Sequence, residues 1–167
     1  MPLPEEVNNL IGKSGDVRVF VVEKGAIMRF ADAVDDQNPL YYDEEFARNS
    51  RYGSIIAPPG YISSFWLTRR VSKFEAQKGA SSNLTEELAN ALTKAGFLNP
   101  GLVDTGMEYD FFKPVRAGDT ITALSKIKDI TVREGKSGKM AFFTIETTFT
   151  NQNDDLVCKS RSITIKR

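Results

Sequence analysis

The sequence contains no histidine among its 167 residues, and this absence excludes more chemistry than any other feature. Without an imidazole, the chain cannot supply Ser-His-Asp or Cys-His catalysis, a histidine general base or the ligands of most catalytic zinc sites. Its single cysteine, Cys158, excludes thiolate zinc cages, iron–sulfur clusters and an internal disulfide. Any chemistry must therefore come from carboxylates, hydroxyls, amines, backbone dipoles or a partner chain.

An excess charge of one sign and long apolar runs are missing as well. The 22 Lys and Arg residues balance 22 Asp and Glu residues, so no overall basic charge favours nucleic acid or an anionic membrane as the main partner. No stretch approaches the ~18 apolar residues of a membrane-spanning helix, and the acidic start lacks the apolar run of a signal peptide. We therefore expect one cytoplasmic domain over residues 1–167, with no nucleic-acid or membrane partner.

The first part of the chain has helical periodicity after a strand candidate at residues 17–22. Apolar residues in 25–34 recur with the spacing of one helical face. A short helix is expected at 43–48, where Asp43 is a suitable N-cap. The pattern then changes, because the next helical segment is apolar around most of its circumference.

That apolar segment opens at Pro58 and runs to about Val71. A helix that is apolar nearly all round belongs in a protein interior. An insertion follows at about 72–100, and it contains an amphipathic helix predicted at 83–96. This second helix must cover either the core of the same chain or a neighbouring subunit.

From Val103 onward the apolar residues recur with the period of two that is typical of strands. Short connections rich in turn-forming residues separate the segments, which predicts an antiparallel meander. The simplest packing wraps a curved antiparallel sheet around the central apolar helix, an α+β arrangement. The predicted strands are residues 103–112, 120–133, 140–150 and 156–166.

Three segments resemble motifs of the MaoC-like (R)-specific enoyl-thioester hydratases and dehydratases. The first, residues 29–47, contains Asp-Asp-Gln-Asn-Pro-Leu-Tyr, and the second, residues 51–60, ends in Ala-Pro-Pro-Gly. The third, residues 108–119, contains Phe-Phe-Lys-Pro-Val-Arg-Ala-Gly-Asp. The resemblance covers about residues 15–66 and 103–165 with the motifs in the expected order, and it implies the hotdog fold.

The resemblance also implies a site. In family members the Asp and His of Asp-x-Asn-Pro-x-His hold a water that adds to an enoyl thioester or leaves a 3-hydroxyacyl thioester. In this chain Asp36, Asn38 and Tyr41 fall at the Asp, Asn and His positions. A phenol with a pKa near 10 is a far poorer proton shuttle than imidazole, and the loss of a positioned acid or base costs ~10²–10⁴-fold in rate.

The resemblance further implies that the start of the central helix binds the thioester, because backbone N–H groups there polarise its carbonyl. Catalytic members often have His-Gly in the loop before this helix, whereas this chain has Pro-Pro-Gly. The substrate-binding residues implied are Ala57, Pro58, Pro59, Gly60, Tyr61 and Phe65.

With Tyr41 at the histidine position, the chain is similar to HadA- or HadC-type dehydratase subunits and to the inert half of two-domain hydratases. Such a subunit shapes the acyl channel, while a second hotdog subunit supplies the Asp-His pair. The implied substrate is an acyl-CoA or acyl-carrier-protein thioester, and neither a metal nor a cofactor is implied. Family hotdogs pair edge to edge, so a homodimer or heterodimer is expected.

Two other functions remain open at this point. In one, the chain is a self-sufficient homodimeric hydratase or thioesterase that uses Asp36 as base and backbone N–H groups at Gly60 as oxyanion hole. In the other, it is a non-enzymatic module that binds acyl thioesters. Structural explanations also exist for each motif: an Asx-Pro turn at Asp36 and Asn38, a core aromatic at Tyr41, and a rigid helix entry at Pro58.

Overall fold

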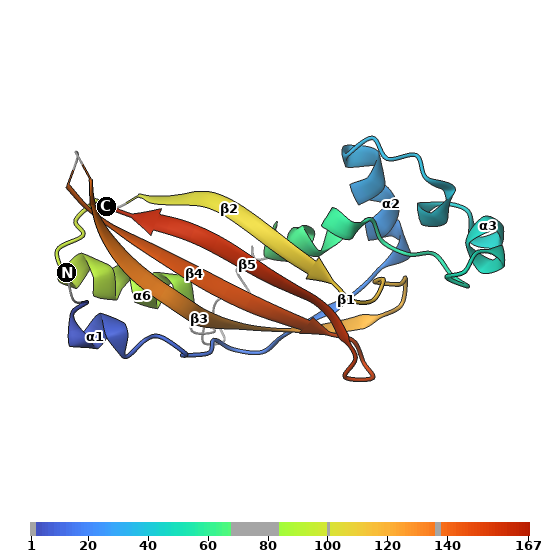
Figure 1. Ribbon diagram of the computed structural model, residues 1–167. Coiled ribbons are helices and arrows are strands. Elements are labelled where there is room, and N and C mark those ends of the chain that lie inside the picture. Colours follow the sequence, from blue (N-terminus) through green and yellow to red (C-terminus); the bar gives the residue numbers. More distant parts are fainter. Residues whose placement is uncertain (1–2, 68–83, 100, 136–137) are drawn as a thin grey trace, which may run out of the picture.

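The computed structural model describes residues 3–67, 84–99, 101–135 and 138–167. Its centre is one five-stranded antiparallel sheet with the order β1-β3-β4-β5-β2 (Figure 1). The strands are β1 (Arg18–Val21), β2 (Leu102–Phe111), β3 (Thr120–Gly135), β4 (Gly138–Thr150) and β5 (Leu156–Lys166). The helical segments are α1 (Glu5–Asn8), α2 (Lys24–Ala33), η1 (Pro39–Tyr41), α3 (Glu44–Asn49), η2 (Pro59–Ser63), α4 (Ser64–Leu67) and α6 (Leu84–Lys94).

The sheet confirms the predicted strands but corrects part of their order. Strands β3, β4 and β5 form the expected meander, whereas β2 pairs with β5 at the far edge and does not contact β3. The reason is that β1 occupies the free side of β3. Backbone hydrogen bonds from Val22 N to Asp119 O and from Gly118 N to Val22 O, both 2.8 Å, hold the end of β1 beside the start of β3.

The inner face of the sheet carries two separate apolar clusters. Strand β4 contributes to both, because alternate residues from Ala141 to Phe149 point inward and are buried. We call the first the motif-side cluster; its buried members include Ile27, Tyr61, Ile62, Phe65, Ile121 and Phe149. We call the second the α6-side cluster; its buried members include Val7, Leu84, Leu88, Leu92, Ile127 and Phe143.

Helix α6 shows which surface the amphipathic helix of the insertion covers. Leu84, Leu88 and Leu92 are buried against the sheet of their own chain, and α6 lies along the same face as α1 (Figure 1). The helix ends as predicted at Gly96, which has the left-handed φ of +94°. Residues 72–83 of the predicted insertion lie outside the described residues. The central helix (η2 and α4) and α6 thus share the inner face, which gives the α+β hotdog arrangement.

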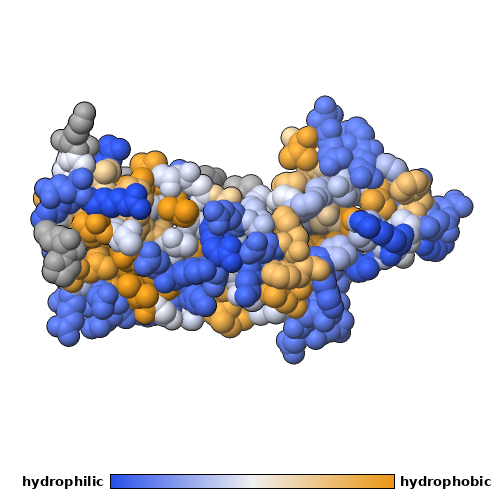
Figure 2. Space-filling model, in the orientation of Figure 1, coloured by the Kyte–Doolittle hydropathy of each residue, from blue (hydrophilic) through white to orange (hydrophobic). Residues whose placement is uncertain are grey.

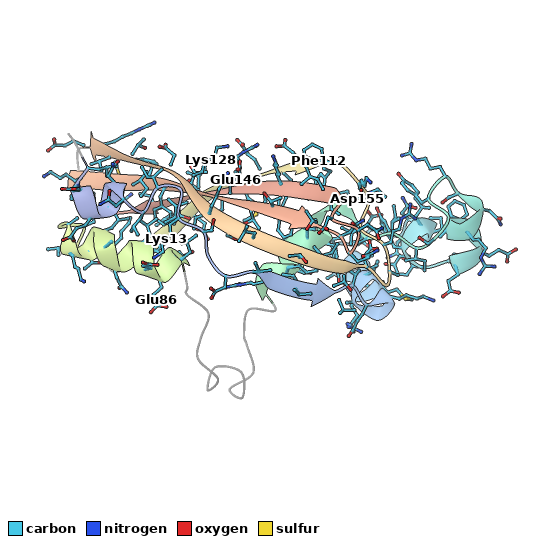
Figure 3. The ribbon with its side chains drawn as sticks, turned by 90° about the horizontal axis from the view of Figure 1, so that it is seen from below. Lys13, Glu86, Phe112, Lys128, Glu146 and Asp155 are labelled. Atoms are coloured by element: carbon cyan, nitrogen blue, oxygen red, sulfur yellow. The ribbon has the colours of Figure 1, made fainter. Side chains whose placement is uncertain are left out.

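The outer face of the sheet carries a row of charges across four strands. Glu146 on β4 accepts from Lys128 at 2.7 Å, from Arg161 at 3.1 Å and forms an ion pair with Lys126 at 3.2 Å. Arg161 also forms an ion pair with Asp110 of β2 at 2.9 Å. Figure 3 shows Lys128 and Glu146 together, on the side of the sheet away from α6. Figure 2 shows apolar patches interspersed with hydrophilic side chains over the sheet.

Within the described part of the chain, no helix has the length and apolar character needed to cross a bilayer.

Candidate functional site

Backbone hydrogen bonds join the three motif segments at one end of the sheet. Ile56 N donates to Leu40 O at 3.3 Å, which links the second motif to the first. Ala57 N donates to Val115 O at 2.8 Å, which links the second motif to the third. The motifs are therefore neighbours in space, although residues 48–107 lie between the first motif and the third in sequence.

The third motif forms a turn whose residues have structural roles. Gly118 has φ +91°, a left-handed conformation that favours glycine, and the Asp119 carboxylate accepts from Arg116 N at 2.7 Å. The Arg116 guanidinium donates to Tyr52 O and, at 2.8 Å, to Ser54 Oγ of the second motif. Sequence reasoning did not find this role of Arg116. The Val-x-x-Gly-Asp pattern predicts the turn, but it does not predict which groups the Arg116 guanidinium contacts.

Asp36 and Asn38 lie in the turn after α2. Asp36 Oδ1 accepts from Asn38 N at 3.2 Å, and Asn38 Oδ1 accepts from Leu40 N at 3.1 Å. The second bond caps η1, whose first residue is Pro39. Asn38 is exposed and Asp36 is partly buried. The Asx-Pro turn is therefore present, and it holds the Asp36 carboxylate in the connection between α2 and η1.

Tyr41 lies beside Asp36, and its side chain is buried. Burial raises the pKa of the Tyr41 phenol, and the charge of Asp36 and a hydrogen bond to its carboxylate raise it further. The neighbouring Tyr42 donates to Asp32 at 2.8 Å; desolvation and this bond raise its pKa to about 12. Both phenols therefore stay protonated at neutral pH, and each donates a hydrogen bond to an aspartate.

The residues predicted at the helix entry divide into exposed and buried ones. Pro59 and Gly60 are exposed at the start of η2, whereas Ala57 and Pro58 are buried. Tyr61 packs edge-on against Phe30 of the first motif, with ring centroids 5.7 Å apart. A Cβ on Gly60 would lie 3.4 Å from the same Phe30 ring, so glycine allows this close approach.

Phe65 lies deeper than the other predicted substrate-binding residues. Its ring stacks on Phe20 at 4.5 Å and meets Tyr61 edge-on at 5.4 Å. It also contacts the ring of Phe149 at 6.4 Å. The structure thus brings Asp36 and Tyr41 together and places Pro59 and Gly60 at the surface, while Phe65 packs within the motif-side cluster.

A cavity of about 770 Å³ lies elsewhere on the inner face, between β2 and the start of α6. Its apolar lining residues are Leu84, Leu102, Met107 and Ile145. Its hydroxyl-bearing lining residues are Ser63, Thr85, Thr105, Ser125, Ser162 and Thr164. Ser63, directly after the predicted helix entry, is the residue that joins the cavity to that segment. Sequence reasoning missed this cavity, although serine and threonine at alternate positions of β5 gave a signal.

Within the described residues, Cys158 and the acidic residues form neither a reactive thiol site nor a metal site. Cys158 is buried, and burial raises the pKa of its thiol to about 11, so the thiol stays protonated. Over the described ranges, no three Cys, Asp or Glu side chains gather in a way that could hold a metal ion.

A family model of the FAS1-like dehydratase domain region matches residues 9–160. The chain belongs to the FAS1-like dehydratase-region family. Its relatives include a probable enoyl-CoA hydratase alpha subunit of Thermomonospora curvata, 25% identical over 136 residues. That match covers 81% of this chain but 41% of the relative, so the chain spans less than half of the relative's length. A UPF0336 protein of Streptomyces avermitilis is 30% identical over 66% of this chain and 63% of its own length.

Solved structures place this FAS1-like dehydratase-region protein among the MaoC-like hotdog folds. The ChsH1-ChsH2 complex of Mycobacterium tuberculosis contains a chain that matches with a TM-score of 0.80 at 20% identity, covering 97% of this chain and 94% of that one. A MaoC-like dehydratase of Rhodospirillum rubrum matches with a TM-score of 0.66 at 24% identity, covering 93% and 91%. The HadBC 3R-hydroxyacyl-ACP dehydratase complex of Mycobacterium tuberculosis matches with a TM-score of 0.65 at 20% identity, covering 93% and 96%.

Proposed function

We propose that this family member is the non-catalytic subunit of an (R)-type 3-hydroxyacyl-thioester dehydratase or enoyl-thioester hydratase. Its role is to shape the acyl channel, while a histidine-bearing hotdog partner supplies the Asp-His dyad. The observation that carries the proposal is the buried, protonated Tyr41 beside Asp36, in a chain that has no histidine. The implied substrate is a CoA or carrier-protein thioester.

The chemistry explains why Tyr41 cannot replace the family histidine. Hydration requires that a water lose a proton as its oxygen attacks C3 of the enoyl thioester, and that C2 gain a proton. A group that does both needs a pKa near the working pH. The pKa of Tyr41 is raised above the ordinary value of 10, and the Asp36 carboxylate accepts hydrogen bonds from the turn and from the phenol. The pair can hold a polar group in place but supplies no proton shuttle.

The exposed edge of β2 supports the proposal that another hotdog subunit binds there. This strand has ten residues, and among the described strands only β5 pairs with it, so no described strand covers its other edge. Val103, Met107 and Phe111 on it are 54%, 45% and 48% exposed. The opposite edge of the sheet, β1, has four residues. The longer edge offers more backbone groups for a continuous sheet across two subunits.

The helix entry is the proposed contact with the thioester. Gly60 lies exposed in the first turn of η2, where the first backbone N–H groups of a helical segment have no intrahelical acceptor. Such donors stabilise the negative charge that develops on a thioester carbonyl during hydration. In this proposal Pro58 and Pro59 hold the entry rigid, because proline fixes its own φ.

The proposal is tested by measuring hydration of trans-2-enoyl-CoA with the purified chain alone and after co-expression with a histidine-bearing hotdog partner. We expect activity in the complex and none in the chain alone. Replacing the partner's dyad histidine by alanine should cost about 10²–10⁴-fold in kcat. Tyr41→Phe in this chain, which keeps the ring and removes the hydroxyl, should cost less than tenfold.

Two outcomes would favour the other functions. Efficient hydration or thioester hydrolysis by the chain alone, abolished by Asp36→Asn, would show a self-sufficient enzyme. Binding of acyl-CoA without turnover by any candidate complex would show a binding module.

A further inference from the structure

The charges along β2 indicate what kind of subunit pairs with it, and this inference rests on the proposed function, which puts the partner at that edge. Strand β2 forms one edge of the sheet, and of the described strands only β5 pairs with it (Figure 1). Its ten residues include Asp104, Glu108 and Asp110 but no lysine or arginine. A second strand at this edge would therefore lie beside three carboxylates and no cation.

The two faces of β2 differ in character. Met107 and Phe111 lie on the inner face, in register with Ser162 and the buried Cys158, and they are 45% and 48% exposed. Glu108 and Asp110 lie on the outer face, where their side chains are 68% and 48% exposed. On the inner face a paired strand would bury apolar area, whereas on the outer face its charge decides between attraction and repulsion.

The cations of the chain itself neutralise these two carboxylates only in part. Among the described residues, only Arg161 forms ion pairs with them, at 3.8 Å to Glu108 and 2.9 Å to Asp110. The same guanidinium donates to Glu146 at 3.1 Å, so one cation serves three carboxylates. Lys159 lies opposite Asp110 in register, but the two form no ion pair in the described structure. The row of charges on the outer face therefore ends in excess negative charge at β2.

Pairing of β2 with β2 of a second copy would bring like charges together. A two-fold axis makes two such edge strands antiparallel, and in every register an acidic strand without cations meets its own copy. Like charges across paired strands are destabilising, and opposite charges are stabilising. We propose that Glu108 and Asp110 oppose self-pairing and favour a different hotdog subunit, whose edge strand carries lysine or arginine on its outer face and apolar residues on its inner face.

A copy of the chain with a basic edge is a defined probe for this proposal. The Glu108→Lys/Asp110→Lys copy is mixed with the natural chain, and sedimentation equilibrium at about 50 mM NaCl, where screening is weak, gives the dissociation constants. We expect the mixed dimer to form at least about fourfold more tightly than a dimer of either copy alone, because two charge pairs change from repulsive to attractive. At about 500 mM NaCl this preference should shrink.

Two further variants control this measurement. Asp129→Lys/Glu134→Lys makes the same change of net charge at exposed positions of β3, which β4 and β5 separate from β2, and it should show no preference for the natural chain. The single variant Glu108→Lys keeps the ion pair between Asp110 and Arg161. It should prefer the natural chain by at least about twofold, so the proposal is testable even when the double variant does not fold.

The complex with the histidine-bearing partner gives a second, independent measurement. Glu108→Gln/Asp110→Asn should weaken that complex by about 2- to 30-fold, the range for the loss of two cross-strand charge pairs. A stable dimer of the natural chain at low salt, no preference for the basic-edge copy, or a partner complex that the neutral variant does not weaken would overturn the inference.

The outcomes also distinguish this inference from the proposed function. A charge-dependent complex that hydrates no enoyl thioester supports the inference and contradicts only the proposed function. An active complex whose affinity is the same with and without the charges of Glu108 and Asp110 leaves the proposed function and removes the inference.

Discussion

The motif-side and α6-side clusters lie on the same face of one sheet but are built differently. The motif-side cluster combines helix α2 with short segments, namely η1, η2, α4 and the turn before β3, and backbone hydrogen bonds and aromatic contacts join them. The α6-side cluster consists of one regular amphipathic helix and α1, which cover aliphatic and aromatic side chains of β3 and β4.

This difference indicates that the two clusters have different structural roles. Irregular segments fix individual groups, such as Asp36 and Gly60, because each residue has its own hydrogen bond or ring contact. A regular helix covers apolar area and leaves room for a cavity at its first turn, where Leu84 and Thr85 line the wall. Individual groups are positioned in one half, and a regular helix covers apolar area beside the cavity in the other.

The largest expected effect is a loss of stability, and it is measured by truncating one buried residue in each cluster. Phe65→Ala removes a ring that contacts three other rings, and we expect it to lower the free energy of unfolding by about 3–5 kcal/mol. Leu88→Ala removes a fully buried side chain of α6 and should cost about 2–5 kcal/mol. Equilibrium urea unfolding measures both values.

Conservative variants control this comparison. Phe65→Leu and Leu88→Met keep most of the buried volume, and Leu88→Met should cost less than about 1.5 kcal/mol. If Phe65→Ala lowers the free energy of unfolding by less than about 1 kcal/mol, the aromatic contacts are not what stabilises the motif-side cluster.

The next prediction concerns Glu146, in the row of charges on the outer face of the sheet. Hydrogen bonds from Lys128 first, and then from Lys126 and Arg161, lower the pKa of Glu146 from 4.5 to about 2, against the opposing effect of burial. A depressed folded-state pKa stabilises the folded protein above the unfolded pKa, and this stabilisation is lost as pH falls from about 4.5 to about 2. Glu146→Gln should cost about 1.5–3 kcal/mol at neutral pH.

Urea unfolding at several pH values measures both the size of the stabilisation by Glu146 and the direction in which it changes with pH. The Glu146→Gln protein should lose less stability than the natural chain between about pH 4.5 and the acid limit, because the titrating group is gone. Glu134→Gln, at an exposed position of β3, is the matched control and should change stability by less than about 0.5 kcal/mol. If the Glu146→Gln protein lost as much stability at acid pH as the natural chain, titration of Glu146 would not be the cause of that loss.

Sequence patterns predicted the strands and the two helical layers because burial imposes a period on the residues. The alternation from Ala141 to Phe149 identified the inner face of β4, and the spacing of Leu84, Leu88 and Leu92 identified the buried face of α6. The order of the strands was less predictable. In the observed order β1 occupies the edge beside β3, where hydrogen bonds join Val22 to residues 118–119, which are 96 or more positions away.

The candidate site was predictable only in part, for a related reason. The proximity of Asp36 and Tyr41 follows from a local turn, so the motif indicated it. The cavity does not, because its lining comes from the segment before β1, the end of η2, the start of α6 and all five strands. A serine such as Ser162 has the same local pattern whether its hydroxyl meets another residue or an open cavity, and only the packed structure tells the two apart.

The smallest expected effect compares two glycines, one at each end of the inner face. Gly118 ends the third motif with φ +91° and Gly96 ends α6 with φ +94°, and a Cβ on either would meet no atom within 4 Å. Alanine at each position should therefore cost about 1–2 kcal/mol through backbone strain alone, measured by urea unfolding. Hydrogen exchange should separate them. Gly118→Ala should speed exchange at Val22 and Arg116, whose amides donate to Asp119, while Gly96→Ala should speed exchange at Phe97, which donates to Leu92 O. Faster exchange in both regions from either variant would show that the two clusters act as one unit.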